Sequence, residues 1–189
     1  MRQSNYPIQS LILNRYSPRA MSGELLSDEE LFSLFEAARW APSAFNAQPW
    51  RFFFAKRETK AWDDLLNLLV PSNRLWAQKG AVLVIITSKT HFDHNGKPAK
   101  THSFDTGAAW EYLALQGFSQ GLVVHGMQGF DYERAKELCH LPEKRAVEAM
   151  IVIGKAGKAE ELSEEMQKRE HPSDRLPLHE IMIDMNDRS

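Results

Sequence analysis

The chain has 189 residues, of which 43% are hydrophobic and 25% are charged, and its formal net charge is −2. This composition is typical of a folded globular domain and excludes a disordered chain, and the lack of a basic surplus argues against nucleic acid or a membrane as partner. Because there is one cysteine, Cys139, and no signal-peptide pattern, we expect a cytoplasmic protein without an internal disulfide framework.

The first half of the chain predicts two helices and two strands after an irregular basic stretch. Ser27 and Glu30 have the spacing of a capping box at the start of a helix, and Pro42 ends that helix. The elements that follow are the loop Ala41–Pro49, the aromatic strand Trp50–Ala55, the helix Lys60–Leu69, which Pro71 breaks, and the strand Ala81–Thr87, which is apolar on both faces.

The second half begins with a polar segment, Ser88–Ser103, which is the best candidate for a long mobile loop. The helix expected at Phe104–Gln120 is apolar around most of its circumference and should be buried, against the sheet and a second subunit. The elements that follow are the strand Leu122–Met127, the helix Asp131–Cys139, the strand Val147–Ile153, the exposed helix Glu160–Glu170 and an apolar tail, His171–Ser189, expected to pack on something. Four strands and about six helices without a regular alternation predict an α+β fold.

Four short segments have the residue types of a ligand site. Arg15–Arg19 places two guanidinium groups and a hydroxyl where they could hold a phosphate, and Pro42–Trp50 offers amide side chains that suit the edge of a heterocycle. Gly126–Phe130 has two glycines that let the backbone approach a ligand, and Ser173–Pro177 contains a late arginine. Each segment alone is better explained as an ordinary surface loop, turn or connection.

In this order, the segments resemble the nitroreductase family. The resemblance rests on Arg-x-Ser-x-Arg near the start, on Ala-Arg-Trp-Ala-Pro-Ser-x-x-Asn-x-Gln-Pro-Trp, on the Met-Gln-Gly-Phe turn and on the late Arg-x-Pro, and it covers roughly Arg15 to Pro177. It implies a mostly antiparallel central sheet wrapped by helices, in an intertwined homodimer with FMN at the subunit interface. Residues 1–189 would then be one domain, with a core of about 12–157 and a C-terminal segment, 158–189, packing on the dimer and the FMN site.

The resemblance also assigns residues to the cofactor. The FMN phosphate would be held by Arg15, Ser17 and Arg175, with Tyr16 beside them, and the ring would be approached by Arg19, by Asn73 and by the Gln128–Gly129 backbone at its N5 edge. The other subunit would contribute Pro42, Ser43, Ala44, Asn46 and Gln48. Three positions depart from the family pattern. Relatives often have an acidic residue in place of Gln128 and a lysine in place of Ser173. They also often have a second cation near the ring, in the region of residues 73–76.

The function that the resemblance implies is an FMN-dependent oxidoreductase. It would pass electrons from NADH or NADPH to a planar electrophile, such as a nitroaromatic, a quinone or an activated alkene. The sequence has no dinucleotide-binding glycine motif, so donor and acceptor would use the flavin in turn, by a ping-pong mechanism. The alternatives are a specialised dehalogenase or flavin-modifying enzyme and a flavin-binding protein without turnover. A metal site at His91, His94 and His102 is not expected.

Overall fold

The computed structural model describes residues 2–187, so Met1, Arg188 and Ser189 of the expected domain and tail lie outside the described residues. A four-stranded antiparallel sheet forms the centre of the molecule, with the strand order β1-β2-β4-β3. The strands are β1 (Trp50–Lys56), β2 (Val82–Lys89), β3 (Leu122–Met127) and β4 (Arg145–Lys155). The α+β prediction is confirmed, and all four expected strands are present.

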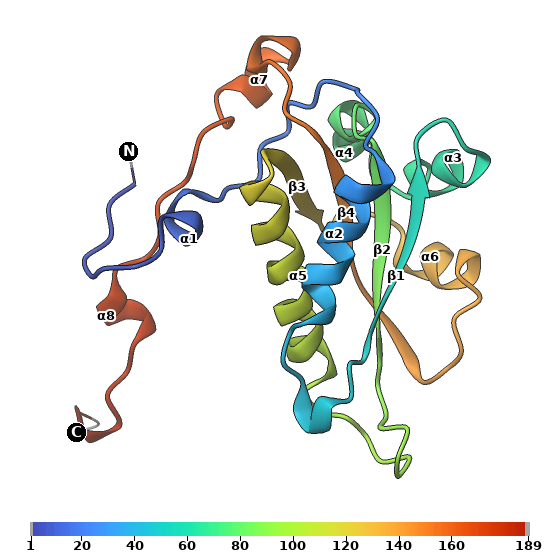
Figure 1. Cartoon of the computed structure of the whole chain (residues 1–189), viewed down its shortest axis with the longest axis vertical. Coiled ribbons are helices and arrows are strands. Elements are labelled where there is room, and N and C mark those ends of the chain that lie inside the picture. Colours follow the sequence, from blue (N-terminus) through green and yellow to red (C-terminus); the bar gives the residue numbers. More distant parts are fainter. Residues whose placement is uncertain (1, 188–189) are drawn as a thin grey trace.

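Helices cover both faces of this sheet (Figure 1). One face carries α2 (Asp28–Arg39) and α5 (His102–Ser119), and the other carries α3 (Lys60–Leu66), α4 (Pro71–Ala77) and α6 (Tyr132–Leu138). A hydrophobic core lies on each face of the sheet, and the central strand β2 contributes side chains to both. Val82, Val84 and Ile86 point to one face, and Leu83 and Ile85 point to the other. This explains why the strand reads as apolar on both faces.

The capping box expected at the start of α2 is present. The Ser27 hydroxyl accepts a hydrogen bond from the Glu30 amide at 3.1 Å, and the Glu30 carboxylate accepts one from the Ser27 amide at 2.8 Å. Helix α5 packs closely on the sheet at Gly117, where an added Cβ would lie 2.4 Å from Val124 Cγ2. A larger residue there would push α5 away from β3.

Two expected helices differ in the structure. The segment 60–69 ends earlier, at Leu66, and Pro71 begins the separate helix α4, because proline has no amide hydrogen to place and suits the first position of a helix. The expected helix Glu160–Glu170 is wrong. Its place is taken by a 3-10 turn, η2 (Ala159–Glu161), and the short α7 (Glu164–Gln167), which Ser163 caps from an extended backbone.

The two ends of the chain form arms that lie beside each other, apart from the sheet (Figure 1). The N-terminal arm contains α1 (Ser10–Asn14), which the sequence analysis did not expect, and the C-terminal arm contains α8 (Leu178–Ile181) and the turn η3 (Met185–Asp187). Large apolar side chains on both arms are 50–72% exposed, namely Tyr6, Ile8, Ile12, Leu176, Ile181, Met182, Ile183 and Met185. Among residues 2–187, no helix has the length and apolar character to cross a membrane.

Candidate functional site

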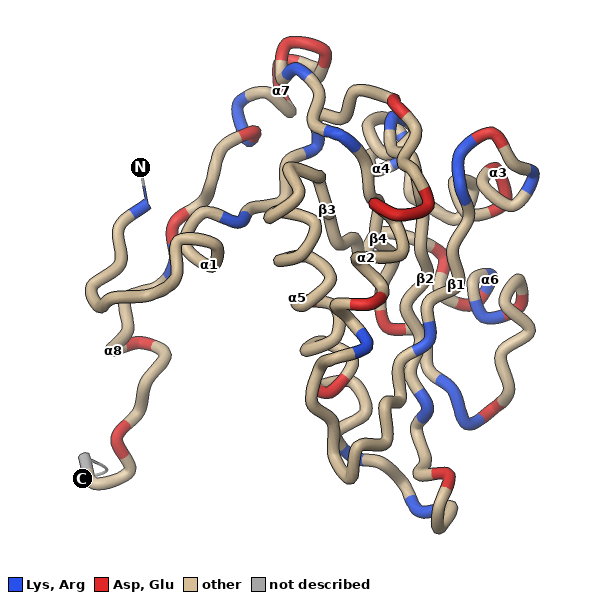
Figure 2. The backbone as a smooth tube through the Cα atoms, viewed as in Figure 1, with Lys and Arg blue, Asp and Glu red and all other residues tan. Residues whose placement is uncertain are grey.

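Three arginines from the two ends of the chain come together where the arms meet α5. Arg15 Nη1 donates to Ser17 Oγ at 3.2 Å, and its Nε lies 3.3 Å from Glu111 Oε1 on α5. Arg2 donates to the carbonyls of Leu13, Arg15 and Ser173, and so ties the N-terminal arm to the C-terminal one. Figure 2 shows basic segments on both arms near α1.

The electrostatics of this cluster suit an anion. The pKa of Arg2 is lowered, first by burial and then by the positive charges of Arg175 and Arg15, with Asp174 acting in the opposite direction. Guanidinium groups that repel one another are stabilised by a bound phosphate, which accepts hydrogen bonds from several of them. The sequence analysis missed Arg2, because an arginine close to a chain end carries no motif.

A groove that Ser17 lines runs along α5. It has a volume of about 480 Å³ and lies between α5 and residues of β2, β3 and β4. Ser17 and Gln128, which the sequence analysis assigned to the phosphate and to the ring, both line it. Gly126 and Trp110 both line it, and a Cβ at Gly126 would lie 3.3 Å from Trp110 Cζ2. An aromatic side chain such as Trp110 can pack against a planar ring.

The turn after β3 is built on glycine. A Cβ at Gly129 would lie 2.8 Å from Asn73 Nδ2 and 2.9 Å from Val70 Cγ2, so no larger residue fits without a shift. Asn73 Nδ2 donates to the Gly129 carbonyl at 3.1 Å, which brings two of the expected ring-binding residues into contact. The turn therefore has no room for a side chain at position 129, next to Gln128, which lines the groove.

Arg19 is more constrained than the sequence suggests. Its guanidinium lies 5.9 Å from the centre of the Trp76 ring and 3.9 Å from Glu170 Oε2. The backbone amides of Arg19 and Ala20 both donate to Glu170 Oε1, at 2.6 and 2.7 Å. Glu170 thus anchors this stretch of backbone and partly neutralises Arg19.

The other expected cofactor residues lie in the loop between α2 and β1, which contains the 3-10 turn η1 (Ala44–Asn46). Phe45, Asn46 and Gln48 have positive φ angles of 53°, 53° and 46°, an uncommon backbone for residues other than glycine that is concentrated at functional sites. Gln48 Nε2 donates to the Asn46 carbonyl at 2.9 Å and to Asn46 Oδ1 at 3.1 Å. The loop is pinned to α5, because the Ala44 amide donates to Asp105 Oδ2 at 3.0 Å.

The arginine cluster and the α2–β1 loop do not meet within one chain. Arg15 contacts α5 at Glu111, whereas the α2–β1 loop contacts α5 at Asp105, near its first turn, and lies at the lower end of α5, away from α1 (Figure 1). Of the remaining residues, Tyr16 and Ser43 are half-buried and Pro42 is exposed. The expected residues thus form two groups, and each one presents part of a site.

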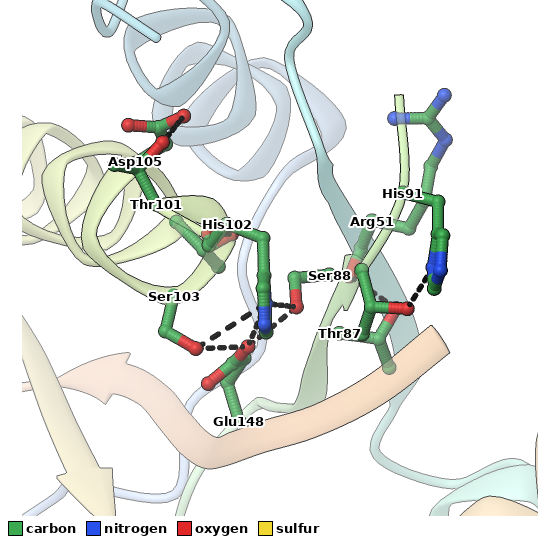
Figure 3. A network of polar contacts seen from close by, with 11 residues as sticks. Arg51, Thr87, Ser88, His91, Thr101, His102, Ser103, Asp105 and Glu148 are labelled. Carbon is green, nitrogen blue, oxygen red and sulfur yellow. Dashed lines mark hydrogen bonds and ion pairs between the residues drawn. The ribbon is translucent and has the colours of Figure 1, made fainter. Parts of the chain in front are cut away.

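A polar network that the sequence analysis did not predict borders the groove (Figure 3). Ser88 Oγ lies 2.7 Å from His102 Nδ1 and also donates to Glu148 Oε1, which accepts a second hydrogen bond from Ser103 Oγ at 2.9 Å. Glu148 is the extra residue where the β2–β4 register shifts, since Ile86 pairs with Ala149 and Thr87 with Val147. A bulge of this kind redirects a side chain, here toward α5. The sequence signal for this network is Glu148 itself, because it is the one charged residue in the otherwise apolar segment Val147–Ile153.

The fold and these surfaces define the class of protein as an α+β protein with a cluster of arginines at the arms and a groove along α5. A model of the nitroreductase family matches residues 12–74. A crystal structure described as an oxidoreductase containing FMN is 41% identical, covers 97% of this chain and 94% of its own, and has a TM-score of 0.94. The chain belongs to the nitroreductase family.

Two further relatives agree. The NADH dehydrogenase of Thermus thermophilus is 27% identical over 206 residues, covering 90% of this chain and 92% of that protein. A nitroreductase family protein of Clostridium difficile is 22% identical, covers 93% of this chain and 96% of its own, and has a TM-score of 0.71, a likeness that extends to the fold.

Proposed function

We propose that this protein is an FMN-dependent oxidoreductase that takes electrons from NADH or NADPH and passes them to a planar electrophile, such as a nitroaromatic, a quinone or an activated alkene. The observation that carries the proposal is the clustering of Arg2, Arg15 and Arg175 from both chain ends, next to Ser17, which lines the same groove as Gln128 and accepts a hydrogen bond from Arg15. The printed descriptions of relatives, an oxidoreductase containing FMN and an NADH dehydrogenase, support it.

The residues present fit FMN. The arginine cluster has more positive than negative charge close by, as a phosphate requires, and the groove volume of about 480 Å³ falls in the usual range for ligand pockets, roughly 300–1,000 Å³. The side chains of Asn73 and Val70 leave no room for a side chain at position 129, so this part of the turn has only backbone to offer a ring edge. Bound FMN supplies the chemistry of hydride transfer, which needs no protein nucleophile.

The role of the chain's own residues would be to bind the cofactor and to orient its ring. Arg15, Ser17 and Arg175 would hold the phosphate by charge-assisted hydrogen bonds, with Tyr16 beside them, and Arg2 ties the two arms together around that place. Arg19 and Asn73 would approach the ring, and the Gln128–Gly129 backbone would face its N5 edge. Trp110 lines the groove, and stacking on its indole ring selects a planar molecule by shape more than by hydrogen-bonding pattern. Such a site favours a broad range of acceptors.

We propose that the working unit is a homodimer. The α2–β1 loop, with Pro42, Ser43, Ala44, Asn46 and Gln48, lies away from the arginine cluster of its own chain, so it would complete the site of a second copy. The arms also expose Ile181, Met182 and Ile183 by 60–72%, and covering such apolar surface is favourable. A second copy accounts for both observations, and the single 1–189 domain would include the arms as its interface elements.

The test begins with the absorption spectrum and mass of the purified protein. We expect flavin absorption near one FMN per subunit, a dimeric mass, bleaching by NADPH or NADH, and recovery of the colour when a quinone is added. Initial-rate lines at several acceptor concentrations should be parallel, as a ping-pong mechanism requires. Colourless, monomeric protein that does not take up added FMN would refute the proposal, and intersecting lines would refute the kinetic scheme alone.

The arginine cluster can be tested separately. Arg175→Gln should weaken FMN binding by roughly 10- to 100-fold, because one charge-assisted hydrogen bond contributes about 1.5–3 kcal/mol. Arg134→Gln removes the same charge from the exposed surface of α6 and should leave FMN affinity unchanged. Equal affinities of the two variants, measured by fluorescence titration of the apoprotein, would show that Arg175 does not hold the phosphate.

A further inference from the structure

A second cluster of cations lies at the other end of the sheet, where the β2–α5 loop meets the start of β4. Lys89, Lys144 and Arg145 line a hollow of about 290 Å³ there, and Asp93 is the one carboxylate among the residues that line it. Figure 2 shows basic segments on neighbouring stretches at this lower end of the molecule. The cluster is separate from Arg15 and Arg175, which lie beside the arms.

The charge of Arg145 is only partly compensated by the residues that the structure describes. Its Nη1 atom is buried and has no hydrogen-bond partner among residues 2–187. The pKa of Arg145 is lowered, first by burial and then by the charge of Arg51, and Asp93 acts in the opposite direction. Asp93, however, is already bound by Lys89. A buried guanidinium nitrogen without a partner is costly, so an anion that enters the hollow would be stabilised.

The hollow continues toward an aromatic surface. A neighbouring hollow of about 240 Å³ shares Lys89, His91, Phe92 and Asp93 with the first and extends to Phe45 in the α2–β1 loop. The rings of Phe45 and Phe92 meet edge to face at 5.5 Å, and Phe45 is 82% exposed. A molecule with both a phosphate and an aromatic ring could therefore contact the cations and the rings together.

We propose that Lys89, Lys144 and Arg145 form a subsite for a nucleotide phosphate, and that this phosphate is the 2′-phosphate of NADPH. The inference rests on the proposed function, because it identifies the ligand as the electron donor. The FMN phosphate already has the arginine cluster at the arms, so this second cation cluster serves a second phosphorylated molecule. The subsite adjoins the hollow that Phe45 lines, in the loop that would complete the partner's flavin site in the proposed homodimer, so a donor held here would lie beside that flavin.

The test compares two nucleotide fragments that differ in the 2′-phosphate. Calorimetric titration of the purified protein should give at least tenfold tighter binding of 2′,5′-ADP than of 5′-AMP. In the Lys144→Gln/Arg145→Gln double variant that preference should fall by about tenfold or more, and the KM for NADPH should rise while kcat with NADPH and the KM for NADH stay nearly constant. Lys60→Gln, a charge change at the exposed start of α3, is the matched control and should behave as the unmodified protein.

The outcomes separate the two proposals. Equal affinity for the two fragments, or a preference that the double variant keeps, would overturn the phosphate subsite even if the protein is a yellow, active reductase. A protein that binds no FMN but prefers 2′,5′-ADP through Lys144 and Arg145 would retain the subsite and refute the reductase. A fall in fragment binding that Lys60→Gln reproduces would mean that general surface charge, and not this hollow, attracts the nucleotide, and would also overturn the subsite.

Discussion

Substituting Gly129 by alanine tests whether the turn after β3 is packed as tightly as the structure indicates. The new Cβ would lie 2.8 Å from Asn73 Nδ2 and 2.9 Å from Val70 Cγ2, both shorter than normal van der Waals contact. Overpacking of this kind lowers the free energy of unfolding by about 1–3 kcal/mol. Replacing a glycine that has no left-handed backbone by alanine raises it by about 0.4–1 kcal/mol. Because two contacts are too short, we expect a net loss of about 1.5 kcal/mol.

The assay is thermal unfolding together with urea unfolding. For a chain of this size a loss of about 1.5 kcal/mol lowers Tm by about 3–6 °C. In an Asn73→Ala background the same substitution should cost less, because one of the two contacts is removed, but the Val70 contact keeps the cost above zero. Gly129→Ala with an unchanged or higher Tm, or an equal cost in both backgrounds, would refute the packing argument.

Two further predictions concern α5 and a buried histidine. Gly107→Ala and Gly117→Ala should both gain about 1 kcal/mol in helix propensity, but only the new Cβ at position 117 would meet Val124 Cγ2, at 2.4 Å. The Tm of Gly117→Ala should therefore be about 2–12 °C lower than the Tm of Gly107→Ala. Similar Tm values for the two variants would contradict this close packing. Burial lowers the pKa of His125, although its hydrogen bond to the Pro18 carbonyl acts in the opposite direction. Below about pH 6.5 the unfolded chain therefore binds a proton that the folded chain does not, and the free energy of unfolding should decrease as the pH is lowered. Urea unfolding between pH 7.5 and 5.5 should show a smaller decrease for His125→Asn than for the unmodified protein. An equal decrease in both proteins would contradict this prediction.

Secondary structure was largely predictable where periodicity was strong. The four strands appear within a few residues of their expected bounds, and the Ser27–Glu30 capping box marks the true start of α2. The errors occurred where local signals were ambiguous. Pro71 can end one helix or begin another, and only the packing of Trp76 against the sheet favours the second. The charged run 160–170 has helix-forming residues but little apolar surface to bury, so it forms only short turns.

The candidate site was less accessible from sequence. The linear motifs found Arg15, Ser17 and Arg175, but Arg2 joins them only because the two arms lie side by side. Glu148 meets Ser88 and His102 only because a bulge in β4 turns its side chain toward α5. The cations near Arg145 are Arg51 of β1, Lys89 of β2 and Lys144, which directly precedes β4, and they share no motif. Contacts of this kind join residues far apart in the chain, so spacing cannot reveal them.

The sequence by itself determined the α+β class, the central apolar strand, the start of α2 and the chemical types in the two expected halves of the cofactor site, because periodicity, capping and side-chain chemistry are local properties. Only the tertiary structure decided which cations share one electrostatic environment, where a glycine is required by a neighbour, and that the α2–β1 loop and the arginine cluster lie apart in one chain. These depend on distances through space, which burial and the order of the strands set and which no local pattern records.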